Sequence, residues 1–195
     1  YIRKAAYLAN IGFQRGLQVV KRGVYCYEVV AEIYHALFQA GQTDTIVSRI
    51  WCWAGPEGGQ MHSSDLTRRI QNGDLVTIEL GGVYNMYRVN AQGTVYVGDR
   101  PPEFIVKTYQ MVADMYKAAA ELIKPQAKAG EVYEGANRVY RLLKGEDYFR
   151  RLGGSMSLGS FDINLIRGNQ EVLHPGVALL IQPLALIVAT LEKKI

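Results

Sequence analysis

Apolar residues recur every three or four positions near the start of the chain, a spacing typical of helices that bury one face. Two such stripes follow each other, and Gly23 between them suits the end of the first helix. The pattern therefore predicts two consecutive amphipathic helices. The apolar positions of the first are Ile2, Ala6, Ala9, Phe13, Leu17 and Val20, and those of the second are Val29, Val30, Ile33, Leu37 and Phe38.

The same helical pattern returns about a hundred residues later. The apolar spacing over residues 105–123 predicts a third helix. This helix should end before Pro125, because proline cannot continue the hydrogen-bond ladder. A fourth helix follows with Val132 and Ala136 facing inward. In both pairs a glutamate followed by a valine opens the second helix, at Glu28 and at Glu131. This repetition predicts an internal duplication.

Extended patterns follow each helical pair. Gly81 and Gly82 predict a turn between two of the strands, and Pro183 marks a strand boundary because proline disfavours the interior of a sheet. The order of elements predicts an α+β domain over residues 1–195, with a curved, mostly antiparallel sheet and helices on its outer face. The predicted strands are 46–53, 74–80, 83–89, 94–97, 177–181 and 184–189.

Composition narrows the class of protein. With 49% hydrophobic and 21% charged residues in a chain of 195, the sequence is that of a globular protein. The net charge of +4 comes from scattered basic residues, the densest group lying at 148–151, so we expect neither nucleic acid nor a membrane as partner. Cys26 and Cys52 are too few for a disulfide framework, and we expect reduced thiols in a cytoplasmic protein.

Several short motifs occur in an order known from one fold family. A Gly-Asp turn at Gly73 precedes a strand, a His-Pro-Gly turn begins at His174, and an Ile-Gln-Pro segment begins at Ile181. In this order they resemble the pita-bread family of creatinase, the Xaa-Pro peptidases and the methionine aminopeptidases. The resemblance implies two pseudo-symmetric helix-helix-strand halves, and we expect the family's additional N-terminal domain to be absent from this chain.

Within that family, creatinase looks nearest. The Trp51-Cys-Trp53 segment resembles its Trp-Thr-Trp strand, and His62 lies at the spacing of its catalytic histidine from the Gly-Asp turn. The resemblance implies that His62 acts as acid and base, since a histidine near neutrality can do so without a metal. A loop histidine bonded only to backbone stays open as the alternative.

The metal-binding members of the family hold two ions through two Asp, one His and two Glu. The resemblance places Glu79 and Asn90 at the two Asp positions, Gln182 at the first Glu, and residues 153–157, which contain no histidine, at the His. The last Glu has no counterpart that we can find. Because divalent ions need several anionic oxygens or imidazoles, we expect no metal and no cofactor.

Two functions follow as expectations. The first is a metal-independent, creatinase-like enzyme that acts on a C–N bond of a small nitrogen-containing molecule, either neutral or carboxylate-bearing, with His62 moving the proton. The second is a catalytically inactive pita-bread domain that serves as a binding or scaffolding module. The resemblance also implies a homodimer. The residues expected to bind the small-molecule substrate are Trp51, Trp53, Glu79, Arg88, Asn90, Gln92 and Gln182.

Overall fold

The computed structural model describes residues 1–42, 44, 49–55, 65–158 and 162–185. The described chain divides into two compact units, the first within Tyr1–Pro101 and the second within Pro102–Ala185. Each unit combines a pair of helices with antiparallel strands. None of the described helices has both the length and the apolar character needed to cross a bilayer.

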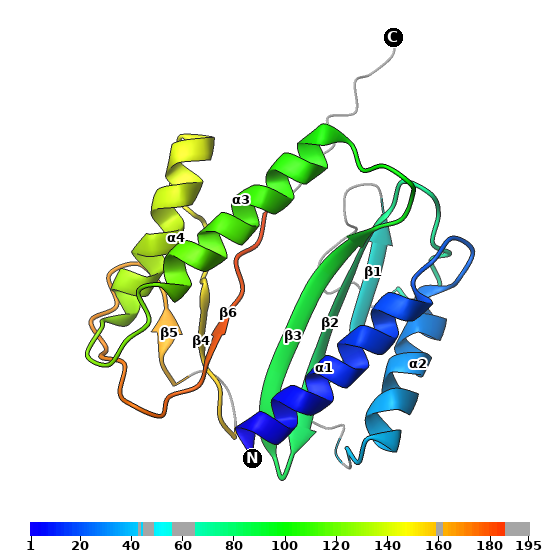
Figure 1. Ribbon diagram of the computed structural model, residues 1–195, viewed down its shortest axis with the longest axis horizontal. Helices are drawn as coiled ribbons and strands as arrows, with labels where there is room; N and C mark the ends of the chain where they lie inside the picture. Colours follow the sequence, from blue (N-terminus) through cyan, green and yellow to red (C-terminus); the bar gives the residue numbers. More distant parts are fainter. Residues whose placement is uncertain (43, 45–48, 56–64, 159–161, 186–195) are drawn as a thin grey trace. The chain divides into compact units, whose positions relative to one another are not determined.

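The first unit packs a helix pair against one side of a three-stranded sheet (Figure 1). The strands lie in the order β1-β2-β3, and both neighbouring pairs are antiparallel. Cys26 and Cys52 are free thiols buried in the core between helices and sheet. The elements of this unit are α1 (Ile2–Val19), α2 (Cys26–Gln39), β1 (Trp51–Gly55), β2 (Leu75–Tyr84) and β3 (Tyr87–Tyr96).

The buried stripe of α1 differs from the predicted one. Ala6 is exposed, whereas the neighbouring Ala5 and Leu8 are buried. The stripe continues through Gly12 and Gly16, where an added Cβ would press against Leu37 and Ile33 of α2 or Ile78 of β2. Close helix packing therefore uses small residues that an apolar count overlooks. The buried residues of α1 are Ala5, Leu8, Ala9, Gly12 and Gly16.

The prediction of a turn at Gly81 and Gly82 is wrong, since both lie inside β2. The chain instead turns at Asn85 and Met86, which have positive φ angles of 48° and 67°. A Cβ at Gly82 would collide with the backbone of α1 at Ala5. This glycine lets the helix approach the sheet, which is the other common reason for a glycine within a strand.

The second unit consists of two long helices and three very short strands among the described residues. Its strands lie in the order β5-β4-β6, and both pairs are antiparallel. Residues 184–185 are not a strand, contrary to prediction, and 186–189 lie outside the described residues. Tyr109 and Tyr116 on α3, which the apolar spacing of residues 105–123 predicts to face inward, are exposed. The elements are α3 (Glu103–Ala120), α4 (Ala129–Lys144), β4 (Gly153–Ser155), β5 (Asn164–Leu165) and β6 (Leu179–Ile181).

The second helix of each unit begins in the same way. The Glu28 carboxylate accepts the backbone N–H of Tyr25 at 2.7 Å, and the Glu131 carboxylate accepts that of Lys128 at 3.1 Å. Each glutamate thereby closes a capping box at the start of its helix. Tyr25 and Lys128 also each form an isolated antiparallel bridge to a later segment. The glutamates that suggested a duplication are therefore the capping residues of two similar halves.

Candidate functional site

Side chains on one face of the three-stranded sheet point away from the helices. On β2, Ile78 and Gly82 meet α1, so the alternate residues face the opposite side. A hydrogen bond of 2.8 Å between the hydroxyls of Thr77 and Thr94 crosses from β2 to β3 and identifies the side chains that share this face. The register then places Glu79 on the same face.

The register brings six predicted site residues to this face. Trp51 of β1 pairs with Glu79, and Glu79 pairs in turn with Gln92 of β3, so the three form a row across the sheet. Trp53 lies opposite Thr77. We call this group the polar sheet face, and it comprises Trp51, Trp53, Glu79, Arg88, Asn90 and Gln92.

Burial and charge differ across the polar sheet face. Trp53 is 5% exposed, whereas Trp51, Glu79 and Gln92 are half-buried. The guanidinium carbon of Arg49 lies 4.0 Å from the centre of the Trp51 ring, a cation–π contact that shows that this indole can hold a cation. The half-buried Trp51 ring beside a carboxylate suits a ligand that carries apolar surface and a positive group.

Gln92 contains a polar atom whose hydrogen bonding is incomplete. Its Oε1 atom is buried, and no donor among the described residues reaches it. Buried polar atoms are nearly always hydrogen-bonded, so an acceptor in this position is suited to a donor from a ligand. This observation supports the prediction that Gln92 contacts substrate. The contact remains a prediction.

Two further site residues were predicted, His62 and Gln182. His62 lies outside the described residues, so its role stays a prediction. Gln182 belongs to the second unit, where it follows β6 and its backbone N–H donates to the Leu152 carbonyl at 2.7 Å. The sequence spacing alone gave no indication that Gln182 belongs to a different unit from the strand residues Glu79 and Gln92.

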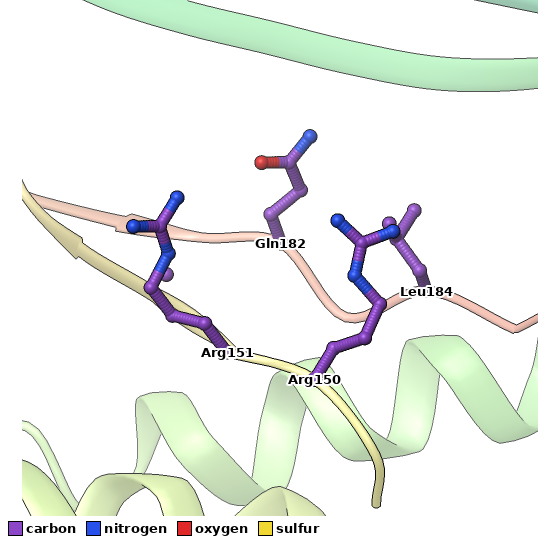
Figure 2. Close-up of a pocket in the computed structure, with 5 residues that line it drawn as sticks. Arg150, Arg151, Gln182 and Leu184 are labelled. Carbon is purple, nitrogen blue, oxygen red and sulfur yellow. The ribbon is translucent and has the colours of Figure 1, made fainter. Parts of the chain in front are cut away.

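Gln182 lines a cavity of about 250 Å³ in the second unit (Figure 2). The side chains of Arg150 and Arg151 lie on the same side of the chain as its amide, and Leu184 adds an apolar wall. Sequence reasoning missed the two arginines as site residues. Their signal in the sequence is the densest basic group of the chain, at 148–151.

Hydrogen bonds hold the segments that line this cavity. Arg151 Nη1 donates to the side-chain oxygen of Asn164 at 3.2 Å, and the Leu184 N–H donates to the Tyr148 hydroxyl at 2.9 Å. Burial raises the pKa of Tyr148, so its hydroxyl stays neutral at physiological pH. The cavity is therefore supported from both the β4 side and the segment after β6.

The described residues do not fit a metal centre. Among them, no group of three His, Cys, Asp or Glu side chains is placed to hold an ion. Glu79 is the single carboxylate of the polar sheet face. In the segment expected to carry the family's histidine, the Ser155 hydroxyl accepts the backbone N–H groups of Asp162 and Ile163 at 3.0 and 2.9 Å, a structural role.

Comparisons with known proteins cover nearly the whole chain. Residues 1–192 match the model of metallopeptidase family M24. The chain is 29% identical over 188 residues to the Xaa-Pro dipeptidase of Pyrococcus furiosus, covering 93% of this chain and 52% of that protein. It is also 29% identical over 159 residues to the probable dipeptidase PepE of Mycobacterium bovis, covering 80% of this chain and 42% of the relative.

Solved structures agree with this result. The prolidase from Pyrococcus furiosus superposes with a TM-score of 0.83 at 27% sequence identity, over 92% of this chain and 53% of that one. The chain spans about half the length of the curated relatives it matches. These matches confirm the pita-bread resemblance and the α+β fold.

The same comparisons overturn the functional prediction. The family is one of metallopeptidases, and the relatives are named as dipeptidases, which cleave peptides. The expected metal-independent, creatinase-like reaction on a small nitrogen-containing molecule is therefore wrong. The expected inactive scaffold gains no support from the comparisons either. The error arose because the replaced ligand positions were weighed above the resemblance of the chain as a whole.

Proposed function

The chain belongs to metallopeptidase family M24, and we propose on this basis that it forms part of an enzyme that hydrolyses short peptides. The observation that carries the proposal is the match over residues 1–192, and the similarity to two dipeptidases adds support. The proposal concerns the class of substrate and of reaction. Because the described residues do not fit a metal centre, their roles are limited to binding and orienting the peptide.

The polar sheet face is the proposed peptide-binding surface. Glu79 binds the ammonium group at the N-terminus of the peptide, because it is the carboxylate of this face and lies in register with Trp51. Trp51 supplies flat apolar surface for the side chain of the substrate, and the buried Trp53 lies on the same face of β1. Gln92 Oε1 accepts an N–H group, which completes its hydrogen bonding.

Hydrolysis assays test the proposal. The chain is incubated with Ala-Pro, Ala-Ala and N-acetyl-Ala-Ala, each with added Mn²⁺, Co²⁺ or Zn²⁺ and with a chelator, and released amino acid is measured. We expect cleavage of the free dipeptides and at least tenfold weaker kcat/KM for the acetylated peptide, since acetylation removes the charge that Glu79 binds, an effect of about 1.4 kcal/mol or more.

Glu79→Gln should lower kcat/KM for Ala-Ala about tenfold and abolish the discrimination against the acetylated peptide. Glu121→Gln is the matched control, because Glu121 is an exposed glutamate at the end of α3. The proposal is wrong if no dipeptide is cleaved under any of the metal conditions. The role of Glu79 is wrong if the variant still discriminates between the free and acetylated peptides.

The proposal extends to assembly and location. We propose a cytoplasmic homodimer, because the family resemblance implies a dimer and the two free, buried thiols suit a reducing compartment. Size-exclusion chromatography with light scattering measures the mass directly. A species near twice 21.8 kDa supports the dimer, and a mass of one chain at micromolar concentration contradicts it.

A further inference from the structure

Cys26 and Cys52 lie in contact within the core of the first unit. Cys26 is the first residue of α2 and Cys52 belongs to β1, so the two thiols come from different elements that pack into one core. Both are free and 0% exposed, and the Cys52 thiol donates a hydrogen bond to the Cys26 sulfur. We propose that these thiols are a redox pair, which hydrogen peroxide converts reversibly into a disulfide that joins α2 to β1.

The surroundings of the two thiols make them unequal. The hydrogen bond from Cys52 lowers the pKa of Cys26, and the charge of Arg68 lowers it further, against the opposing effect of burial. The position of Cys26 at the start of a helix acts in the same direction, because the helix dipole favours a negative charge there. The same hydrogen bond and burial raise the pKa of Cys52. Cys26 is therefore the nucleophile of the pair, and Cys52 is the thiol that closes the disulfide.

Arg68 is held where its charge can act on Cys26. Its carbonyl accepts the Cys26 N–H at 3.0 Å, and its Nη2 atom donates to Asp74 at 2.8 Å. The Arg68 Nε atom is buried, and within the described part of the chain no acceptor reaches it. Negative charge on the Cys26 sulfur is therefore matched by a neighbouring guanidinium group, which favours the reactive thiolate.

Hydrogen peroxide is the oxidant that suits a buried thiol, because the molecule is uncharged and little larger than water. The Cys26 thiolate attacks one peroxide oxygen, the O–O bond breaks, and hydroxide leaves to give a sulfenic acid. The Cys52 sulfur then attacks the Cys26 sulfur, and the hydroxyl group leaves as water with the Cys52 proton. Overall, two thiols and one peroxide give one disulfide and two water molecules.

The disulfide would form directly behind the polar sheet face. Cys52 pairs with Ile78, whose side chain faces α1, so the Cys52 side chain lies on the helix side of the sheet. Trp51 and Trp53, the two tryptophans of the chain, flank Cys52 on β1. Oxidation therefore joins α2 to the strand that carries both indoles. The inference does not depend on the proposed function, because neither thiol belongs to the polar sheet face.

Peptide mass spectrometry on the whole chain tests the pair directly. The reduced wild type is treated with hydrogen peroxide, the remaining thiols are alkylated in denaturant, and the chain is digested without reductant. We expect one peptide pair joined through Cys26 and Cys52 within a single chain, and recovery of both thiols after treatment with dithiothreitol. The inference is overturned if both thiols are alkylated, if they become sulfinic acids without the joined peptides, or if the disulfide links two chains.

Two matched variants test which thiol reacts first. In Cys52→Ser the hydroxyl group still donates to Cys26, and dimedone should trap a sulfenic acid on Cys26. In Cys26→Ser the remaining thiol should react with peroxide at least about tenfold more slowly, because a buried thiol of raised pKa is seldom ionised. Equal rates, or a faster reaction of Cys26→Ser, would overturn the assignment of the nucleophile. Circular dichroism checks that each variant folds, and the wild-type experiment needs neither of them.

Tryptophan fluorescence follows the reaction in solution, because a disulfide quenches indoles close to it. Emission of the wild type should fall on treatment with peroxide and return with dithiothreitol. Emission of Cys52→Ser should stay constant under the same treatment, which controls for oxidation of methionine. An equal fall in both proteins would contradict a disulfide at β1.

Discussion

The two units begin their second helices with the same capping box but build different sheets beside them. In the first unit β2 and β3 are ten residues each and pair over their whole length, whereas the strands of the second unit have two or three residues. A long regular ladder collects alternate residues onto one face. Short strands leave the site to the segments that flank them, so that Arg150 and Gln182 line one cavity although 32 positions separate them.

The difference also appears in charge. The polar sheet face carries the Glu79 carboxylate and two amides, Asn90 and Gln92, beside Arg88, whereas the cavity of the second unit is lined by two cations. The two halves therefore gather side chains of different charge. A duplicated fold specifies where side chains can gather, and the individual residues specify which ligand they suit.

The substitution with the largest expected effect disrupts the contact between α1 and the sheet of the first unit. Gly82→Val would place side-chain atoms where Ala5 and Ala9 of α1 have their backbone. We expect a loss of about 3 kcal/mol in the free energy of unfolding, or no folding, because overpacking against backbone cannot relax. Thr94→Val, on the other face of this sheet, removes only the hydrogen bond to the Thr77 hydroxyl and should cost about 1–2 kcal/mol in urea denaturation. Equal losses would contradict the close approach.

The second prediction compares the stability lost when one buried side-chain amide is removed from each unit. Asn137 is fully buried, accepts the Tyr148 N–H at 2.7 Å, and donates to Glu134 and Asp147. Asn137→Ala should cost about 2–3 kcal/mol, because it leaves a buried N–H group unsatisfied. Gln42 in the first unit is 2% exposed and accepts the Val83 N–H at 2.9 Å.

Gln42→Ala should cost about 1–3 kcal/mol in the free energy of unfolding, because it leaves the buried N–H group of Val83 without its acceptor. Urea denaturation measures both variants. Asn137 should be the costlier of the two, since its Nδ2 group adds hydrogen bonds to two carboxylates. If either variant loses less than about 0.5 kcal/mol, its amide does not support the backbone that it contacts.

The smallest effect appears only in acid. Hydrogen bonds from Arg167 and then Arg141 lower the pKa of Asp147 from 3.8 to about 2. A carboxyl group whose pKa is lower in the folded state stabilises that state above its ordinary pKa, and the contribution disappears as the pH falls from about 4 to about 2. The wild type should therefore lose more stability over this interval than Asp147→Asn.

Thermal melts between pH 5 and pH 2 measure this difference. Asp99→Asn, at an exposed position after β3, controls for the loss of one negative charge. Melting temperatures of wild type and Asp147→Asn that fall in parallel would show that the Arg167 and Arg141 contacts contribute nothing to stability in the folded protein.

Local patterns predicted much of the first unit. Apolar spacing located both helices, and the extended pattern that ends at Trp53 predicted a strand that overlaps β1. Gly82 was misread as part of a turn, because a glycine in a sequence does not indicate whether it provides a positive φ or room for a neighbouring helix. Glu79 and Gln92 were placed together by family resemblance, and the strand register then showed that they pair.

The sequence by itself determined the helix pairs, their capping glutamates Glu28 and Glu131, and the family, because these depend on local spacing and on the order of motifs along the chain. Only the tertiary structure decided that Gln182 lies with Arg150 and Arg151 around one cavity. The physical reason is that strands of two or three residues carry no readable periodicity, so the meeting of distant segments depends on how they pack.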